Sequence, residues 1–207
     1  MPAQGDKKIS SAHPRYTQEG APLNAFRDTR VLTEAALAIA LAFVLGLIRL
    51  FKMPYGGSIS LEMMPLILLA LRQGPWVGVV SGAVYGLLNL ISDPQIFHPV
   101  QVLLDYPLAF AALGLAGLFR PTARGAVVGA TVAVLARFVC HFLSGVVFFA
   151  AYAPEGWNPY AYSAAYNGAY LAPSLLIAVV VVVVLLRALR SAQPSPRQLR
   201  HRRSAVS

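Results

Sequence analysis

The sequence predicts an all-α membrane protein with six transmembrane helices, and three observations support this fold class. Of the 207 residues, 57% are hydrophobic and only 12% are charged, about half the charged fraction of an average soluble domain. The mean hydropathy is +0.61, so lipid suits most of these side chains better than water does. The apolar residues also run in continuous stretches, whereas the strands of a membrane barrel would alternate over about ten residues.

Six apolar segments are candidate spans, because a span needs about 20 mostly apolar residues. They are expected at 31–51, 61–71, 76–91, 100–119, 125–152 and 161–189. The second is too short to cross alone. It is expected either to be tilted or to begin in the non-helical segment 54–60, which would then lie inside the protein. The polar ends at 1–29 and 191–207 are expected to be tails around a membrane domain at 30–190, the first of them disordered.

The placement of basic residues predicts that both ends face the cytoplasm. With the N-terminus inside, 14 of the 17 Lys and Arg residues fall in cytoplasmic tails and loops, as the positive-inside rule requires. Arg49 and Lys52 would lie outside, and Arg137 would lie within the fifth span. Only an even number of spans gives this division. Because the net charge of +9 is spread over tails and loops, nucleic-acid binding is not expected.

Polar groups within a span are costly and are usually functional or paired. Gln101 and Asp105 are four residues apart near the outer end of the fourth span, so they share a helix face. No basic residue stands at helical spacing from Asp105. Its partner is expected to be either Arg137, in a structural ion pair, or a cationic ligand, and the spacing favours neither.

A histidine and an arginine lie one turn apart in the fifth span, at His141 and Arg137. A lone buried histidine is more often a packing residue, but His141 could also bond a ligand or relay protons. No second His or Cys stands beside it at metal-ligand spacing, so no metal site is expected.

Tyrosines recur every four residues at the outer start of the sixth span, at Tyr162, Tyr166 and Tyr170. An aromatic belt at the membrane interface would account for them. However, Asn167 lies one turn deeper than Ser163 and needs a partner. Aromatic faces also bind organic cations, so a ligand site is the alternative.

A Gly-Gly-Ser segment precedes the second span, where it could form a connecting loop or a lid. Glu62 is expected to cap that span at the positive end of its dipole. In the predicted topology this segment and the three polar or aromatic clusters all lie in the outer half. A carboxylate, amides, a histidine and aromatic rings at one level describe a pocket for a small, flat, cationic ligand.

A separate feature lies on the first span, where Ala36 and Ala40 are four residues apart among further alanines. Small residues at this spacing let another helix approach closely. The spacing fits packing within the bundle and docking of a partner helix equally well.

Five short motifs, taken together, resemble the thiamine-specific substrate-binding (S) components of energy-coupling factor transporters. The likeness covers residues 28 to 190. In chain order the motifs are Arg30-Val-Leu-Thr-Glu-Ala-Ala, Gly56-Gly-Ser-Ile-Ser-Leu-Glu-Met-Met-Pro, Leu104-Asp-Tyr, His141-Phe-Leu-Ser-Gly and Tyr162-Ser-Ala-Ala-Tyr-Asn-Gly.

The resemblance implies a six-helix S component in a prokaryotic plasma membrane, without catalysis or a cofactor of its own. It implies that Asp105 faces the thiazolium ring of thiamine beside Tyr106. Two positions that are tryptophan in relatives fall on Gly56 and Phe149, and the first is a departure from the family pattern. The full set of expected ligand-binding residues is Gln101, Asp105, Tyr106, His141, Gly145, Phe149, Tyr162 and Asn167.

The resemblance also implies partners. The Ala36/Ala40 face would dock a membrane-embedded coupling subunit, which joins two cytoplasmic ATPases. This sequence contains no P-loop, so ATP would be hydrolysed by those partners. Two alternatives are an S component for another small vitamin or a thiamine precursor, and a membrane enzyme with Asp105 and His141 as an acid–base pair.

Overall fold

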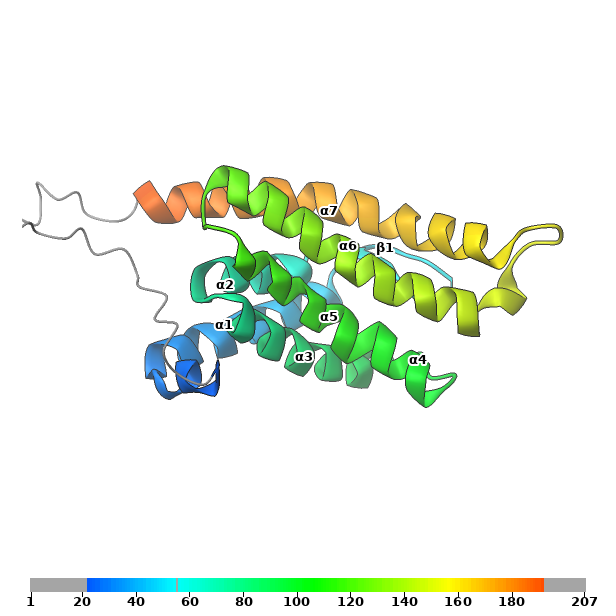
Figure 1. Cartoon of the computed structure of the whole chain (residues 1–207), viewed down its shortest axis with the longest axis horizontal. Coiled ribbons are helices and arrows are strands. Elements are labelled where there is room, and N and C mark those ends of the chain that lie inside the picture. Colours follow the sequence, from blue (N-terminus) through cyan, green and yellow to red (C-terminus); the bar gives the residue numbers. More distant parts are fainter. Residues whose placement is uncertain (1–21, 55, 192–207) are drawn as a thin grey trace, which may run out of the picture.

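Six helical passes form a bundle whose described ends both lie at its left end in Figure 1. The computed structural model describes residues 22–54 and 56–191. Its elements are η1 (Pro22–Arg27), α1 (Thr29–Leu47), β1 (Arg49–Lys52), β2 (Ser58–Ser60), α2 (Met63–Gln73), α3 (Pro75–Ser92), α4 (Pro99–Leu103), η2 (Leu104–Leu108), α5 (Ala109–Ala111), η3 (Ala112–Leu118), α6 (Ala123–Phe148), η4 (Ala150–Tyr152) and α7 (Pro159–Ser191).

The predicted fold class is confirmed. Five of the passes, at 29–47, 75–92, 99–118, 123–148 and 159–189, are long and apolar enough to cross a membrane. The remaining pass is α2, with 11 residues, which at 1.5 Å per residue is roughly 16 Å long. Eight of its residues are buried, and it packs against α1, α3, α7 and the fourth pass. A helix that is apolar on all sides belongs at the centre of a bundle.

The first span ends earlier than predicted, at Leu47 rather than Phe51. The residues after it form β1, which pairs antiparallel with β2 (Figure 1). Gly57 has a φ of +73°, a backbone conformation that favours glycine, and its carbonyl closes the turn by accepting from the Met53 N–H at 3.0 Å. The segment before α2 is thus non-helical, as one of the two alternatives for the second span expects, and Ser60 within it is buried.

The fourth pass, residues 99–118, is continuously helical, but its helix type changes along its length. A π-helical turn covers Leu104–Leu108 and contains Pro107, which lacks the N–H that a regular helix would use at that position. Such π turns are frequent at functional sites. Gly82 and Gly86 of α3 lie against the backbone of this pass, and a Cβ at either position would overlap main-chain atoms.

Most of the two predicted tails, namely residues 1–21 and 192–207, lies outside the described residues. Within the described part of the first tail, Pro22–Arg27 forms the 3-10 helix η1. Phe26 packs beside a small cluster of Ala35, Leu69 and Val77. Asp28 then caps α1 by accepting from the Arg30 N–H at 2.9 Å.

Candidate functional site

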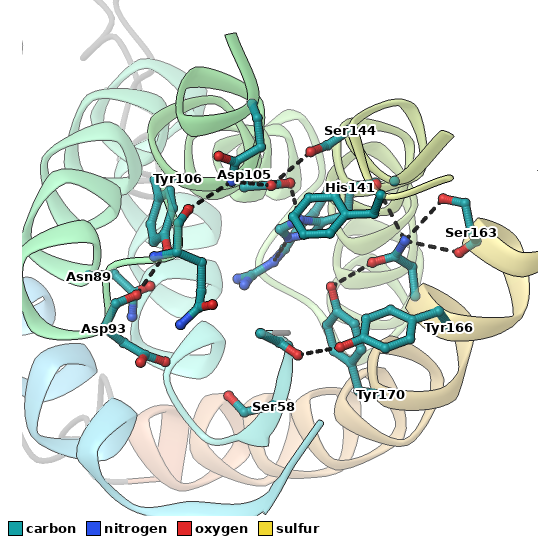
Figure 2. A pocket seen from close by; sticks show the side chains of 18 of the residues that line it. Ser58, Asn89, Asp93, Asp105, Tyr106, His141, Ser144, Ser163, Tyr166 and Tyr170 are labelled. Atoms are coloured by element: carbon teal, nitrogen blue, oxygen red, sulfur yellow. Dashed lines mark hydrogen bonds and ion pairs between the residues drawn. The ribbon is translucent and has the colours of Figure 1, made fainter. Parts of the chain in front are cut away.

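A cavity opens at the end of the bundle that carries the β-hairpin. Its walls come from the hairpin, the start of α2, the end of α3, the fourth pass, α6 and α7. Figure 2 shows Asp105, His141 and Ser144 on one side of the cavity and Tyr166 and Tyr170 on another. All eight residues predicted to bind a ligand line it: Gln101, Asp105, Tyr106, His141, Gly145, Phe149, Tyr162 and Asn167.

The Asp105 carboxylate is held by an amide, a hydroxyl and an imidazole. Gln101 Nε2 and Ser144 Oγ donate to its Oδ2 at 2.7 Å and 2.8 Å. His141 Nδ1 lies 2.9 Å from its Oδ1. The proposed ion pair between Asp105 and Arg137 is not formed, because the Arg137 guanidinium instead pairs with Glu62 at 3.5 Å.

The other two carboxylates that line the cavity each have a permanent cation beside them. Asp93 is 2.8 Å from Arg49 and 3.1 Å from Lys52, and Glu62 is paired with Arg137. Within residues 22–54 and 56–191, no lysine or arginine forms an ion pair with Asp105. Because its side chain is only 16% exposed, the carboxylate is poorly solvated and attracts a cation strongly.

Gln101 and Tyr106 both fasten the loop 93–98 over the cavity. Gln101 is fully buried, and besides Asp105 its amide bonds the Gln95 carbonyl and the Phe97 N–H. The Tyr106 hydroxyl donates to the Asp93 carbonyl at 2.8 Å and accepts from the Gln95 N–H at 2.7 Å. Both residues therefore shape the wall with polar atoms that are already bonded within the chain.

The opposite wall is amide and aromatic. Asn167 Nδ2 donates to the Ser163 carbonyl at 2.9 Å, and its Oδ1 accepts from the Tyr170 hydroxyl at 2.9 Å. The Tyr166 hydroxyl reaches across to the carbonyls of Pro54 and Gly56. This contact ties the hairpin turn to α7. Tyr162 and Phe149 complete the aromatic lining.

Glu62 stands at the N-cap position of α2, as predicted, but its side chain makes no cap hydrogen bond. It accepts instead from the Tyr85 hydroxyl at 2.7 Å and pairs with Arg137. The expected position at the positive end of the α2 dipole is therefore confirmed, and the side chain uses its oxygens for other partners. A buried carboxylate satisfied by a hydroxyl and a guanidinium belongs to a polar network.

Several cavity residues were not among the predicted ligand-binding set. Ser144 is the most important, since it bonds Asp105 directly. It lies three residues after His141 in the sequence, and no local pattern links it to Asp105 in another pass. Asp93 and Gln95 lie in a loop without periodicity. Tyr170 continues the four-residue tyrosine spacing, so that pattern did contain the signal.

Six apolar passes around a poorly solvated carboxylate and an aromatic-lined cavity define an integral membrane protein that binds a small ligand. The chain matches the family model described as "Thiamine transporter protein" over residues 32–193. The chain belongs to this family, and the family resemblance seen in the sequence is confirmed.

Individual relatives cover most of the chain. It is 36% identical over 174 residues to "Thiamine transporter ThiT" of Bacillus subtilis (76% of this chain, 91% of that protein). It is 34% identical over 173 residues to the protein of the same name in Lacticaseibacillus paracasei (75% and 86%). A solved structure of ThiT from Listeria monocytogenes matches with a TM-score of 0.70 and 30% identity, over 78% of this chain and 96% of the other.

Proposed function

We propose that this chain is the high-affinity thiamine-binding S component of an ATP-driven energy-coupling factor transporter. It is a multi-pass protein of the cell membrane and a member of a transporter family. One observation carries the choice of ligand: Asp105 is a poorly solvated carboxylate in the cavity wall whose described partners are an amide, a hydroxyl and an imidazole.

The chemistry of thiamine fits this arrangement. Its thiazolium ring carries a permanent positive charge, which suits a carboxylate that pairs with no arginine or lysine of the described residues. Both of its rings are flat, and aromatic side chains such as Tyr162 and Phe149 line the cavity. Aromatic faces attract organic cations by about 0.5–2 kcal/mol, more when the site is dry.

The transport role requires partners that supply energy. The sequence contains no P-loop, and the family resemblance implies a membrane-embedded coupling subunit joined to two cytoplasmic ATPases. Ala36 and Ala40 are both exposed on α1. This supports the proposal that they form a docking face rather than part of the internal packing.

Two alternatives are weaker. A thiamine precursor that consists of the pyrimidine half alone has no cation to place beside Asp105. An enzyme with His141 as a general base would need a free ring nitrogen, yet one nitrogen faces Asp105 and the other accepts from Arg137. The relatives are named as transporters, so the enzyme alternative has no support from them.

Ligand titration of the purified protein tests the proposal. Thiamine at 100 times its dissociation constant should stabilise the folded protein by about 2.7 kcal/mol. The uncharged hydroxymethyl-pyrimidine precursor should give a much smaller thermal shift at equal concentration. Equal or tighter binding of the precursor would favour the alternative S component, and no response to thiamine would contradict the proposed ligand.

A further inference from the structure

A buried polar network runs from Tyr85 of α3 to His141 in the cavity wall, and His141 in turn contacts Asp105. The Tyr85 hydroxyl donates to Glu62 Oε2 at 2.7 Å. The other oxygen of Glu62 is 3.5 Å from Arg137 Nη2, and these two side chains are only 8% and 7% exposed. The Arg137 Nε–H then donates to His141 Nε2 at 3.2 Å.

The direction of these bonds fixes the protonation of His141. A guanidinium has only donors, so His141 Nε2 must accept and cannot carry a hydrogen. The ring proton therefore sits on Nδ1, from which it donates to Asp105 Oδ1. A second proton on the ring would place two positive groups against each other at 3.2 Å, which is unfavourable in a site with little water.

The position of Arg137 is itself strongly constrained. Its guanidinium carbon lies 3.8 Å from the centre of the Phe110 ring, and Glu62 holds Nη2. Its Nη1 is buried and has no hydrogen-bond partner within the described residues. Leaving a buried donor unsatisfied costs about 1–3 kcal/mol. The guanidinium of Arg137 is therefore oriented by the contacts of its Nε and Nη2, at the cost of leaving Nη1 without a hydrogen bond.

We propose that Arg137, anchored by Glu62, is a positioning residue that holds His141 as the neutral Nδ1–H tautomer and thereby keeps the charge of Asp105 available for a cationic ligand. A protonated His141 would form an ion pair with Asp105 and compete with the ligand cation. A neutral His141 orients the carboxylate by one hydrogen bond and leaves its charge uncompensated. The ligand part of this inference rests on the proposed function, whereas the tautomer part does not.

The tautomer can be measured in the ligand-free protein. In ¹⁵N-histidine-labelled protein, with the His141 resonances assigned by their loss in His141→Gln, the wild type should show a protonated Nδ1 and a bare Nε2. The double variant Glu62→Gln, Arg137→Met removes both charged partners, leaves the net charge unchanged and keeps an acceptor for Tyr85. It should show an Nε2–H or doubly protonated His141. A wild type with a hydrogen on Nε2 would overturn the inference.

Binding to the same double variant tests the consequence for the ligand. Thiamine affinity should fall at least tenfold, while affinity for a thiamine analogue with an uncharged ring in place of the thiazolium should change less than threefold. The matched control is Glu34→Gln, Arg72→Met, which removes another Arg–Glu pair, 3.2 Å apart, near the start of α1 and the end of α2. It should leave the tautomer and both affinities unchanged.

The outcomes separate this inference from the proposed function. If the wild type binds no thiamine, the proposed function fails, and the NMR signature still decides whether Arg137 sets the tautomer. If the double variant keeps the Nδ1–H tautomer, Arg137 does not set it and the inference is wrong. The inference is equally wrong if the tautomer changes and thiamine affinity stays within threefold of wild type.

Discussion

Asp105 Oδ1 and His141 Nδ1 lie 2.9 Å apart, although the two residues belong to different membrane passes. The π-helical turn of η2 contains Asp105, and the regular helix α6 carries both His141 and Ser144. Three side chains thus converge on one carboxylate from two passes. This arrangement fixes the orientation of the carboxylate, and no lysine or arginine of the described residues is paired with it.

Replacing Asp105 by asparagine should weaken thiamine binding at least tenfold, or about 1.4 kcal/mol. The substitution removes the charge while keeping the shape. It also turns an amide nitrogen toward groups that are themselves donors, such as Gln101 Nε2 and Ser144 Oγ. Titration calorimetry on the purified variant measures the effect.

The control for this variant is Asp28→Asn. It makes the same chemical change at the exposed N-cap of α1, where asparagine caps as well as aspartate, and it should leave affinity unchanged. If Asp105→Asn also binds normally, Asp105 serves only to anchor Gln101, Ser144 and His141.

Replacing Gly145 by alanine should separate the two helices that form the amide wall. A Cβ there would overlap the Ser163 hydroxyl and lie 3.0 Å from the Ser163 Cβ, while that hydroxyl is fixed by the Phe142 carbonyl at 2.8 Å. Overpacking of this kind costs about 1–3 kcal/mol. We expect a lower melting temperature and weaker thiamine binding.

Gly168→Ala is the matched control for the overpacked variant. A Cβ at this position of α7 meets nothing within 4 Å, so the same substitution should leave binding unchanged and stabilise the helix by up to about 1 kcal/mol. Equal melting temperatures and affinities for the two variants would show that α6 and α7 can move apart without losing stability or thiamine binding.

Removing the Tyr166 hydroxyl should loosen the hairpin turn over the cavity. This hydroxyl is the described link from α7 to the carbonyls of Pro54 and Gly56. A hydrogen bond contributes about 0.5–1.5 kcal/mol, so Tyr166→Phe should speed thiamine dissociation by roughly 2- to 12-fold. Stopped-flow displacement measures that rate.

The companion variant is Tyr160→Phe, which removes a hydroxyl from an exposed tyrosine of the same helix and should not change the rate. A dissociation rate in Tyr166→Phe equal to that of wild type would mean that the turn stays closed without its link to α7.

The spans and the main cavity residues could be predicted because both depend on local signals. Continuous apolar runs reveal membrane helices, and Asp105 or Asn167 stands out as a polar group in an apolar segment. Their convergence follows from the predicted topology, in which the ends of the first, third and fifth spans and the starts of the second, fourth and sixth all face outside. All eight predicted residues consequently line one cavity.

The features that were missed depend on pairings between distant residues. The apolar run 31–51 predicts a helix that continues through β1, because the pairing of β1 with β2 across the turn leaves no local signal. The role of Glu62 depends on Tyr85 and Arg137, which come from two other helices. The close approach of α3 to the fourth pass did leave a signal, in Gly78, Gly82 and Gly86 at four-residue spacing.

The predicted orientation places both chain ends in the cytoplasm. A reporter fused at Ser207 should therefore report the cytoplasm, and one inserted near Pro154, between α6 and α7, should report the exterior. The expectation rests on the 14 basic residues that this orientation puts inside. Both reporters on one side would contradict the six-pass topology.

A bulky substitution on α1 should separate ligand binding from transport. Ala36 and Ala40 are exposed, so a larger side chain at either position points away from the described bundle and is tolerated by the fold. The double variant Ala36→Trp, Ala40→Trp should bind thiamine normally as a purified protein. In cells that carry the coupling subunits it should lose uptake, because close helix contact depends on small residues.

The control for this variant makes the same change on another lipid-facing helix. Leu176 and Val180 of α7 are also four residues apart and are 70% and 62% exposed, so Leu176→Trp, Val180→Trp adds equal bulk without touching the proposed docking face. It should keep both binding and uptake. Loss of uptake in both variants would point to a general effect on the membrane domain, and normal uptake in the α1 variant would mean that the coupling subunit docks elsewhere.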